Sequence, residues 1–172
     1  MHFEIAHEFD IPLDALELAV VSPNLIRRLD ATVRDRAVGI EKISEKRHDL
    51  RDGVLDRQWH YQANVHLPQF ARGYVTRDMC AWDENSVYEM KAHRGSWTIV
   101  PRIKPEWQKY FSASGTYAVE ALGGGRSRRQ VEGHIELRVR VVRQMAERLI
   151  VGEVKKAFEA EASTLREMAT LI

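Results

Sequence analysis

The fold is decided by the C-terminal stretch VRVVRQMAERLIVGEVKKAFEAEASTLREMATLI, residues 139–172. This stretch contains no proline, is rich in Ala, Glu, Arg and Leu, and follows a strand-like segment with no turn residues between them. Such residues favour the helix and proline would break it, so the stretch predicts one long C-terminal helix. We expect a curved antiparallel sheet, built by the rest of the chain, to clasp this helix.

Two apolar stripes run along the predicted helix. The first joins Val142, Met145 and Leu149 at helical spacing. The second repeats at alternating steps of three and four residues and comprises Val151, Val154, Phe158, Leu165, Met168 and Ile172. Gly152 stands where the stripes change over, and we expect it to let sheet or loop backbone come close. The alternative is a flex point that opens a pocket.

Glu161 falls on the second stripe, where a leucine would be expected. A buried carboxylate needs a partner, so Glu161 could face a wet cavity or an arginine of the sheet. The alternative, which we favour from the sequence alone, is that the last helical turns project past the sheet and leave Glu161 in solvent.

Composition bounds the class of protein. The chain of 172 residues has a formal net charge of +1, so no overall field favours nucleic acid or a membrane. The single cysteine, Cys80, fits a reducing compartment, and we interpret it as a small half-buried strand residue because no local motif would activate it. No apolar run approaches the roughly 20 residues that span a bilayer. The first residues also lack the features of a signal peptide, so we expect a cytoplasmic protein.

The first residues alternate as a strand does. Residues 2–9 predict a strand whose covered face carries Phe3, Ile5, His7 and Phe9. Two short helices are expected next, over residues 13–21 and from Ser22-Pro23 to about Leu29. Pro12 and Pro23 suit first helical turns, and Ser22 is a good N-cap.

The middle of the chain predicts strands separated by turns. Val38 to Leu50 is a charged strand expected at a sheet edge. Further strands are expected over residues 54–67, 79–92 with an internal turn at 83–86, 95–103, 107–122 and 126–139. The signals Asp52-Gly53 and Gly123-Gly124-Gly125 predict hairpin turns.

A family resemblance appears at the start of this order. The residues Phe9-Asp10-Ile11-Pro12-Leu13-Asp14-Ala15-Leu16, followed by Ser22-Pro23, resemble the opening of the START-like (SRPBCC) superfamily. That superfamily includes birch-pollen-allergen-like proteins, polyketide cyclases and lipid-transfer domains, and this chain resembles an uncharacterised bacterial branch. The resemblance covers the whole chain and rests on the order of elements rather than on a catalytic motif.

The resemblance implies a single START-like domain over residues 1–172 with the α+β helix-grip fold. In that fold a curved antiparallel sheet of about seven strands surrounds a long C-terminal helix, and two short helices follow strand 1. It also implies an elongated cavity between the concave face of the sheet and the long helix.

Aromatic and Met side chains are the candidate ligand lining, because rings offer large contact areas and Met adapts to irregular shapes. The candidates are Trp59, Tyr61, Met90, Trp97, Met145, Leu149 and Phe158, with Met168 beside them. An ordinary packed core is the alternative. An empty void of ~300 Å³ would cost on the order of 7 kcal/mol, which rivals a typical domain stability of ~5–15 kcal/mol. The interior is therefore expected to be filled by side chains or to hold a ligand or water.

The sequence offers no catalytic or metal-binding motif. His60 and His66 share a strand face but stand six residues apart, and neither a His-x-His pair nor a His-Glu-x-x-His pattern occurs. A nucleophile elbow and a phosphate-binding glycine loop are also missing. We predict no metal, no cofactor and no catalytic residue. If acid–base chemistry occurs, His7 and Glu161 are the inward candidates.

These observations favour a protein that binds or transfers a lipid or other apolar small molecule in an internal cavity. The alternative is a polyketide cyclase/aromatase-like enzyme that uses the same cavity. A third class is a non-catalytic interaction module with a filled core. No nucleic-acid partner is expected.

A transient contact with a membrane surface is a further hypothesis. Arg126, Arg128 and Arg129 cluster at the glycine turn and could bind an anionic surface, with an apolar tip supplied by Leu67, Pro68 and Phe70. A solvated hairpin end is the alternative that we favour.

Overall fold

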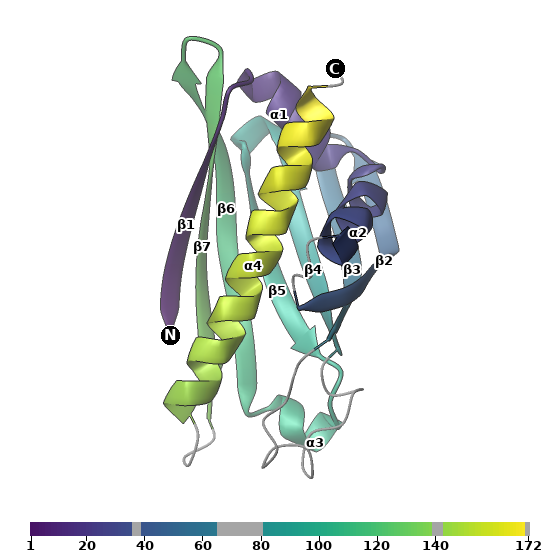
Figure 1. The fold of residues 1–172 in the computed structure, drawn as a ribbon, viewed down its shortest axis with the longest axis vertical. Helices are drawn as coiled ribbons and strands as arrows, with labels where there is room; N and C mark the ends of the chain where they lie inside the picture. The colour runs from purple at the N-terminus through teal and green to yellow at the C-terminus, as the bar shows by residue number, and fades with distance from the viewer. Residues whose placement is uncertain (36–38, 65–80, 139–142, 171–172) are drawn as a thin grey trace.

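The computed structural model describes residues 1–35, 39–64, 81–138 and 143–170, and these form the helix-grip fold (Figure 1). Along the described chain a strand is followed by two helices, six further strands with two short helical turns among them, and a long helix. The elements are β1 (His2–Phe9), α1 (Leu13–Val21), α2 (Leu25–Asp35), β2 (Ile40–Arg51), β3 (Val54–Ala63), β4 (Ala81–Glu89), η2 (Met90–Ala92), β5 (Arg94–Pro101), α3 (Pro105–Gln108), β6 (Phe111–Gly123), β7 (Arg126–Leu137) and α4 (Arg143–Ala169).

The seven strands form one antiparallel sheet in the order β1-β7-β6-β5-β4-β3-β2. In Figure 1 the yellow helix α4 crosses the face of this sheet, and α1 and α2 pack against α4 and against the sheet. Strands β3 and β7 alternate buried and more exposed residues, as a sheet covered on one face requires. The core therefore lies between the sheet and the three larger helices.

Most predicted elements are confirmed. The covered face of β1 holds Phe3, His7 and Phe9, and the second stripe of α4 is buried as far as Met168. Strand β2 is an edge of the sheet, and Asp30 of α2 accepts the Ile43 N–H at 2.8 Å, which satisfies one of its edge donors. Ile172, Cys80, His66 and the loop at 67–73 lie outside the described residues.

The second helix is longer than predicted. Helix α2 begins at Leu25 and runs to Asp35, past the expected end at Leu29, because Thr32 and Val33 continue its buried face. Ser22 still serves the helix entrance, since its Oγ accepts the Asn24 N–H at 3.2 Å.

The turn predicted at residues 83–86 is wrong, and β4 continues through it. Residues that favour turns are used here as cross-strand partners. Asp83 accepts from His60 Nδ1 at 2.8 Å, and Asn85 Oδ1 accepts from Gln58 Nε2 at 2.9 Å. These pairs to β3 outweigh the local turn preference of the sequence.

Buried polar contacts attach α1 to the sheet and α2 to α4. Tyr88 of β4 donates to Glu17 of α1 at 2.6 Å, and Thr164 of α4 donates to Thr32 of α2 at 3.0 Å.

Among the described helices, none is long and apolar enough to cross a membrane.

Two glycines make room for the largest ring of the core. Gly115 and Gly133 face each other on β6 and β7, and Gly115 is also paired with Trp97. A Cβ on Gly133 would lie 2.5 Å from the ring of Phe3 and 2.6 Å from that of Trp97, closer than packed side chains approach. Trp97 is only 2% exposed, so its indole occupies the space that the glycines leave.

Gly152 has no such role. A Cβ placed there would meet no atom of the described residues within 4 Å, so the expectation that backbone comes close to it is wrong for the part of the chain that the structure describes. Its place in the middle of α4 leaves the ordinary cost of glycine in a helix, about 1 kcal/mol relative to Ala.

These two glycines should respond to alanine in opposite directions. Gly133→Ala is expected to lower the free energy of unfolding by about 1–3 kcal/mol through overpacking. Gly152→Ala is expected to raise it by up to about 1 kcal/mol. Urea denaturation followed by circular dichroism measures both, and a Gly133→Ala protein as stable as the parent would contradict the packing described here.

Candidate functional site

A buried ion-pair cluster joins α4 to the sheet. Arg129 Nη1 of β7 donates to Glu161 Oε2 at 2.7 Å, and Arg57 Nη2 of β3 lies 3.6 Å from Glu161 Oε1. Arg129 Nη2 also donates to the carbonyl of Phe158 at 3.0 Å. Glu161 is 6% exposed, so the expectation of a solvated carboxylate is wrong, and the alternative of an arginine partner on the sheet is confirmed. The C-terminal half of α4 lies over the sheet instead of projecting past it.

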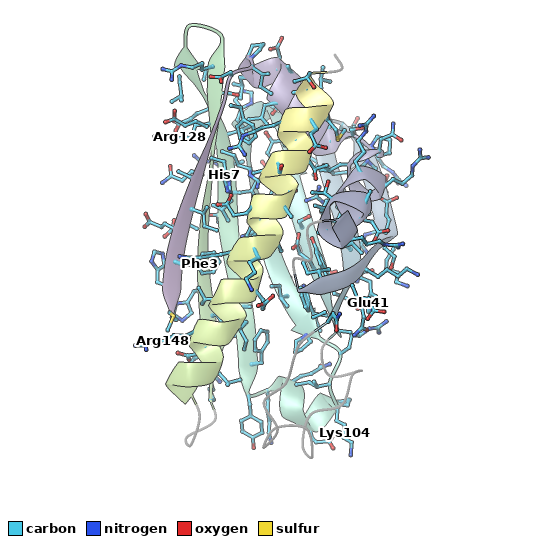
Figure 2. The ribbon with its side chains drawn as sticks, viewed as in Figure 1. Phe3, His7, Glu41, Lys104, Arg128 and Arg148 are labelled. Atoms are coloured by element: carbon cyan, nitrogen blue, oxygen red, sulfur yellow. The ribbon has the colours of Figure 1, made fainter. Side chains whose placement is uncertain are left out.

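The three arginines after the glycine turn do not form one patch. Consecutive strand residues point to opposite faces, so Arg129 enters the core while its neighbours face outward. Arg128 pairs with Glu120 at 2.5 Å, and Arg126 lies 3.7 Å from Glu8. Figure 2 places Arg128 on the outer side of the sheet, away from α4. The membrane hypothesis thus loses one of its three cations, and its apolar tip at Leu67, Pro68 and Phe70 lies outside the described residues.

A second carboxyl group enters the same region from β4. Glu84 stands between Trp59 of β3 and Ile99 of β5 in the register of the sheet. Burial raises the pKa of Glu84 to about 7, against the opposing effect of the charge of Arg57. Burial would also raise the pKa of Glu161, but Arg129 and Arg57 outweigh it and hold that pKa below its ordinary value. At neutral pH the two carboxyl groups therefore differ, because Glu161 is ionised while Glu84 is close to its titration midpoint.

Two small cavities lie against these groups, each of about 10 Å³, which is room for about one water molecule. Glu84, Phe158 and Glu161 line both of them. The first is also lined by Tyr61, Trp82, Ile99, Val154 and Ala157, and the second by Arg57, Trp97, Tyr117 and Arg129.

Several buried polar atoms around the second cavity have no hydrogen-bond partner within the described chain. They are Arg57 Nη1, Trp97 Nε1, Tyr117 Oη and Arg129 Nε, with Trp59 Nε1 nearby on β3. A buried donor left without an acceptor costs about 1–3 kcal/mol. The region therefore calls for acceptor atoms, from water or from a bound molecule.

The predicted lining residues are partly brought together. Trp59, Tyr61, Trp97 and Phe158 are all buried, and the Trp97 and Phe158 rings lie 5.6 Å apart. Tyr61, Trp97 and Phe158 line the cavities, whereas Trp59 stacks under Arg57 at 3.7 Å. Met90 lies in η2, between β4 and β5, and lines neither cavity.

Met145 and Leu149 belong to α4, but their side chains lie outside the described part of the structure. The role of the predicted set as a ligand lining stays a prediction.

The sequence did not predict Arg57, Glu84 or Arg129 as site residues: Arg57 was not singled out, Glu84 was placed in a turn, and Arg129 in the arginine cluster at the glycine turn. Each stands in the inward phase of its strand: Arg57 with Leu55 and Trp59, and Arg129 with Val131. A charged residue in the apolar phase was the available signal, and it was noticed only on the helix, at Glu161.

His7 is a core residue at the edge of this region. It is 3% exposed, its Nε2 lies 3.0 Å from Glu159 Oε1, and it is paired with Arg129 in the sheet. Figure 2 shows it beside α4. Burial lowers the pKa of His7 and the charge of Arg129 lowers it further, so His7 is held neutral.

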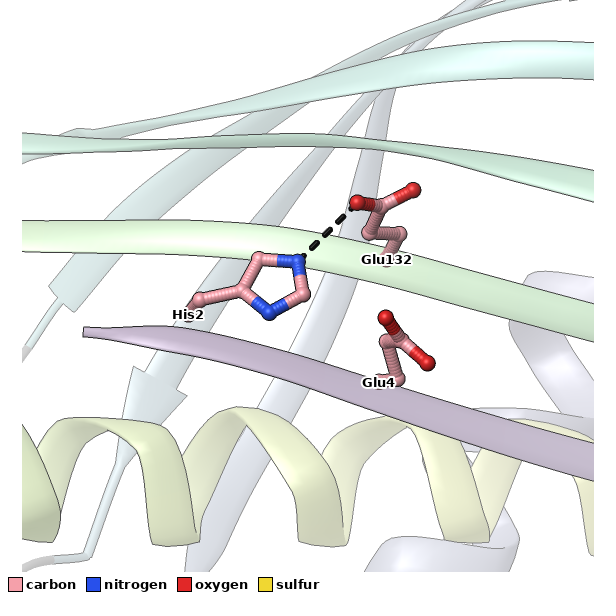
Figure 3. A group of neighbouring side chains, drawn as sticks. All are labelled: His2, Glu4 and Glu132. Carbon is pink, nitrogen blue, oxygen red and sulfur yellow. Dashed lines mark hydrogen bonds and ion pairs between the residues drawn. The ribbon is translucent and has the colours of Figure 1, made fainter.

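A separate group lies on the outer face, where His2, Glu4 and Glu132 come together on β1 and β7 (Figure 3). His2 Nε2 lies 3.0 Å from Glu132 Oε1, and Glu4 is paired with Glu132 across the strands. All three side chains are exposed, so water solvates them, and a surface hydrogen bond accounts for the contact.

The order of elements and the sheet topology define the class: the protein has the helix-grip fold. Solved structures with this fold include the Zhui aromatase/cyclase from Streptomyces sp. R1128, with a TM-score of 0.62 and 12% identity over 99% of this chain and 93% of that one. Norcoclaurine synthase from Thalictrum flavum has a TM-score of 0.63 and 11% identity over 95% and 84% of the two chains, and another structure of it is a complex with dopamine and hydroxybenzaldehyde. TTHA0849 from Thermus thermophilus has a TM-score of 0.62 and 12% identity over 99% and 98%.

The particular family follows from the sequence. The chain belongs to the family described as "Protein of unknown function (DUF2505)", whose model matches residues 4–168. A sequence search of the curated proteins found no match. At 11–12% identity the structural likeness establishes the fold alone.

Removing the charge of Glu161 should destabilise the protein strongly. Glu161→Gln leaves two buried guanidinium groups with only the partly ionised Glu84 as counter-charge, so the free energy of unfolding is expected to fall by about 3–5 kcal/mol. The control is Glu8→Gln, whose exposed pair with Arg126 should contribute about 0–1 kcal/mol. Urea denaturation compares the two, and equal small effects would mean that the cluster is solvated.

The pKa of Glu84 predicts a pH effect of defined sign. Its pKa is about 7 in the folded protein and ordinarily 4.5, so the folded state holds an extra proton between these values. This group's contribution to stability therefore falls as pH rises from about 4.5 to above 7. His7 acts in the opposite direction, because its lowered pKa makes stability rise with pH up to about 6.5.

A variant isolates the contribution of Glu84. The ionisable groups that face it are Arg57 and Tyr61 on β3, Tyr117 on β6, Arg129 on β7 and Glu161 on α4. Glu84→Gln keeps these groups and His7, so their contributions cancel when the two proteins are compared. Between about pH 5 and pH 8 the free energy of unfolding of the parent should therefore fall relative to that of Glu84→Gln. Urea denaturation across this range measures it, with the exposed Glu89→Gln on the same strand as control. A pH-independent difference would place Glu84 in solvent.

Proposed function

We propose that this protein binds an apolar small molecule between the sheet and α4, at the cluster formed by the buried Arg57, Arg129 and Glu161 and the half-buried Glu84. The supporting observation is the pair of cavities in which aromatic rings stand beside buried polar atoms that have no partner. A core that served only packing would hold apolar side chains there, since burying charges costs several kcal/mol per ion. Rings with a few convergent polar groups are typical of a small-molecule site.

The guest requires the interior to open. Cavities of about 10 Å³ hold water and no larger molecule. A benzene-sized space of ~150 Å³ would cost about 4 kcal/mol if it stayed empty, so a protein without its guest is expected to close on itself. Trp82, Glu84, Ile99 and Ala157 are the half-buried residues of the first cavity's wall, and the guest is proposed to enter past Trp82 and Ile99.

The structural neighbours support the proposal at the level of the fold. Norcoclaurine synthase holds dopamine and hydroxybenzaldehyde in one of its structures, so a chain of this architecture accommodates aromatic molecules. The aromatase/cyclase belongs to the same architecture. Their chemistry does not transfer, because function lies in side chains that differ at this level of identity.

A cyclase/aromatase-like enzyme is the second candidate, and one observation favours it. Glu84 lines both cavities with a pKa of about 7, which suits a general acid or base at neutral pH. An enzyme that used it would lose turnover in Glu84→Gln while still binding its substrate. A binding protein would show no turnover to lose.

Filling the first cavity should block binding without changing any charge. Ala157 of α4 lines that cavity, so Ala157→Phe is expected to lower the affinity for 2-naphthol, followed by its fluorescence, by at least about tenfold. Lys155→Phe adds the same ring on the exposed face of the helix and should bind as the parent does. Equal affinities in all three proteins would place the bound probe elsewhere and overturn the proposed site.

A further inference from the structure

The residues that carry the unpaired donors come from four different strands and line the same cavity, the second one. Arg57 Nη1 comes from β3, Trp97 Nε1 from β5, Tyr117 Oη from β6 and Arg129 Nε from β7. All four can donate a hydrogen bond, and only the tyrosine hydroxyl can also accept one. A group that complements them must therefore be rich in acceptors.

The charges around the cavity also favour a group that is rich in acceptors, because positive charge is in excess there. Arg57 and Arg129 are both at most 4% exposed, and they share one ionised carboxylate, that of Glu161. Glu84 adds little negative charge below neutral pH, because burial raises its pKa to about 7. The cluster thus carries an excess of about half a positive charge at pH 7, which approaches one as the pH falls below 7. A buried excess charge is costly unless it is paired.

The two arginines are not equivalent. Arg129 binds Glu161 at 2.7 Å and also holds the carbonyl of Phe158 at 3.0 Å, so it fixes the helix. Arg57 lies 3.6 Å from the same carboxylate, outside ordinary hydrogen-bond distance. Its Nε donates to Ser86 at 3.2 Å and its guanidinium stacks over Trp59 at 3.7 Å, which fixes its plane while Nη1 stays unpaired.

We infer that the guest is a monoanion, an apolar molecule that carries one carboxylate, and that Arg57 is the residue that pairs with it. The inference rests on the proposed function and names the chemical class of its ligand. A carboxylate offers two oxygens and accepts hydrogen bonds only, so it complements the donors of Arg57, Trp97 and Tyr117. The ring of Phe158, shared by both cavities, would contact the apolar body.

A matched pair of probes tests the charge, since 2-naphthoate and 2-naphthamide share one ring system and differ in the anionic group. Titration calorimetry at about pH 6.5, where the naphthoate is ionised, should give the parent protein at least about tenfold higher affinity for naphthoate. Arg57→Gln should remove this preference and leave the affinity for naphthamide within about threefold. Arg128→Gln, an exposed arginine on β7, should retain the preference.

Each outcome bears on a different claim. Equal affinity of the parent for the two probes, or an unchanged preference in Arg57→Gln, overturns the inference and leaves the proposed function standing. Binding of neither probe overturns the proposed function for aromatic guests and the inference with it. If Arg57→Gln does not fold, Arg57→Lys replaces it. The lysine keeps the charge but loses the planar donor fork, so it should lower naphthoate affinity several-fold and leave naphthamide unchanged.

Discussion

The contact of Glu161 with Arg129 and Arg57 is the constraint on which the rest of the interior depends. It joins α4 to β7 and to β3, two strands that lie well apart in the sheet order. Charge pairing of this kind is directional, so it fixes both the rotation of α4 about its axis and its position along the sheet. Apolar packing alone would tolerate small slides of the helix, whereas a displaced Glu161 would leave two guanidinium groups unpaired in the core.

The aromatic rings make this burial of charge tolerable. The guanidinium of Arg57 lies 3.7 Å from the centre of the Trp59 ring, and that of Arg129 lies 5.8 Å from the centre of Phe158. Each ring presents a negative face to a cation that has lost its water. Gly115 and Gly133 complete the arrangement, since the space that they leave is taken by Trp97 in the wall of the second cavity. Rings, glycines and charges form one packed unit.

The sequence predicted the strands and the helix that surround this unit better than the contacts among the charged residues at its centre. Alternation in residues 126–137 and the apolar stripe from Val151 to Met168 are local signals, and both elements appear where these signals placed them. The turn expected at 83–86 failed because Asp83 and Asn85 find partners on β3, which no local pattern reveals. The charged cluster was not predicted for the same reason. Glu161 was recognised as misplaced on an apolar stripe, but its partners stand 32 residues away at Arg129 and much farther away at Arg57.

A closely packed interior is compatible with the proposed binding site, because the unpaired donors belong to residues that line the second cavity. In a core built for stability alone, the apolar packing is complete and buried polar atoms are paired. Around Phe158 the cavities are small, yet four of the residues that line the second cavity, Arg57, Trp97, Tyr117 and Arg129, each have a buried donor without a partner in the described chain. Replacing the cluster by apolar side chains of similar volume would be expected to cost nothing or to stabilise the fold. The charges that fix α4 on the sheet are therefore not required for stability alone, which is consistent with the proposed binding site, and the closeness of the packing would set how tightly a guest must bind to open it.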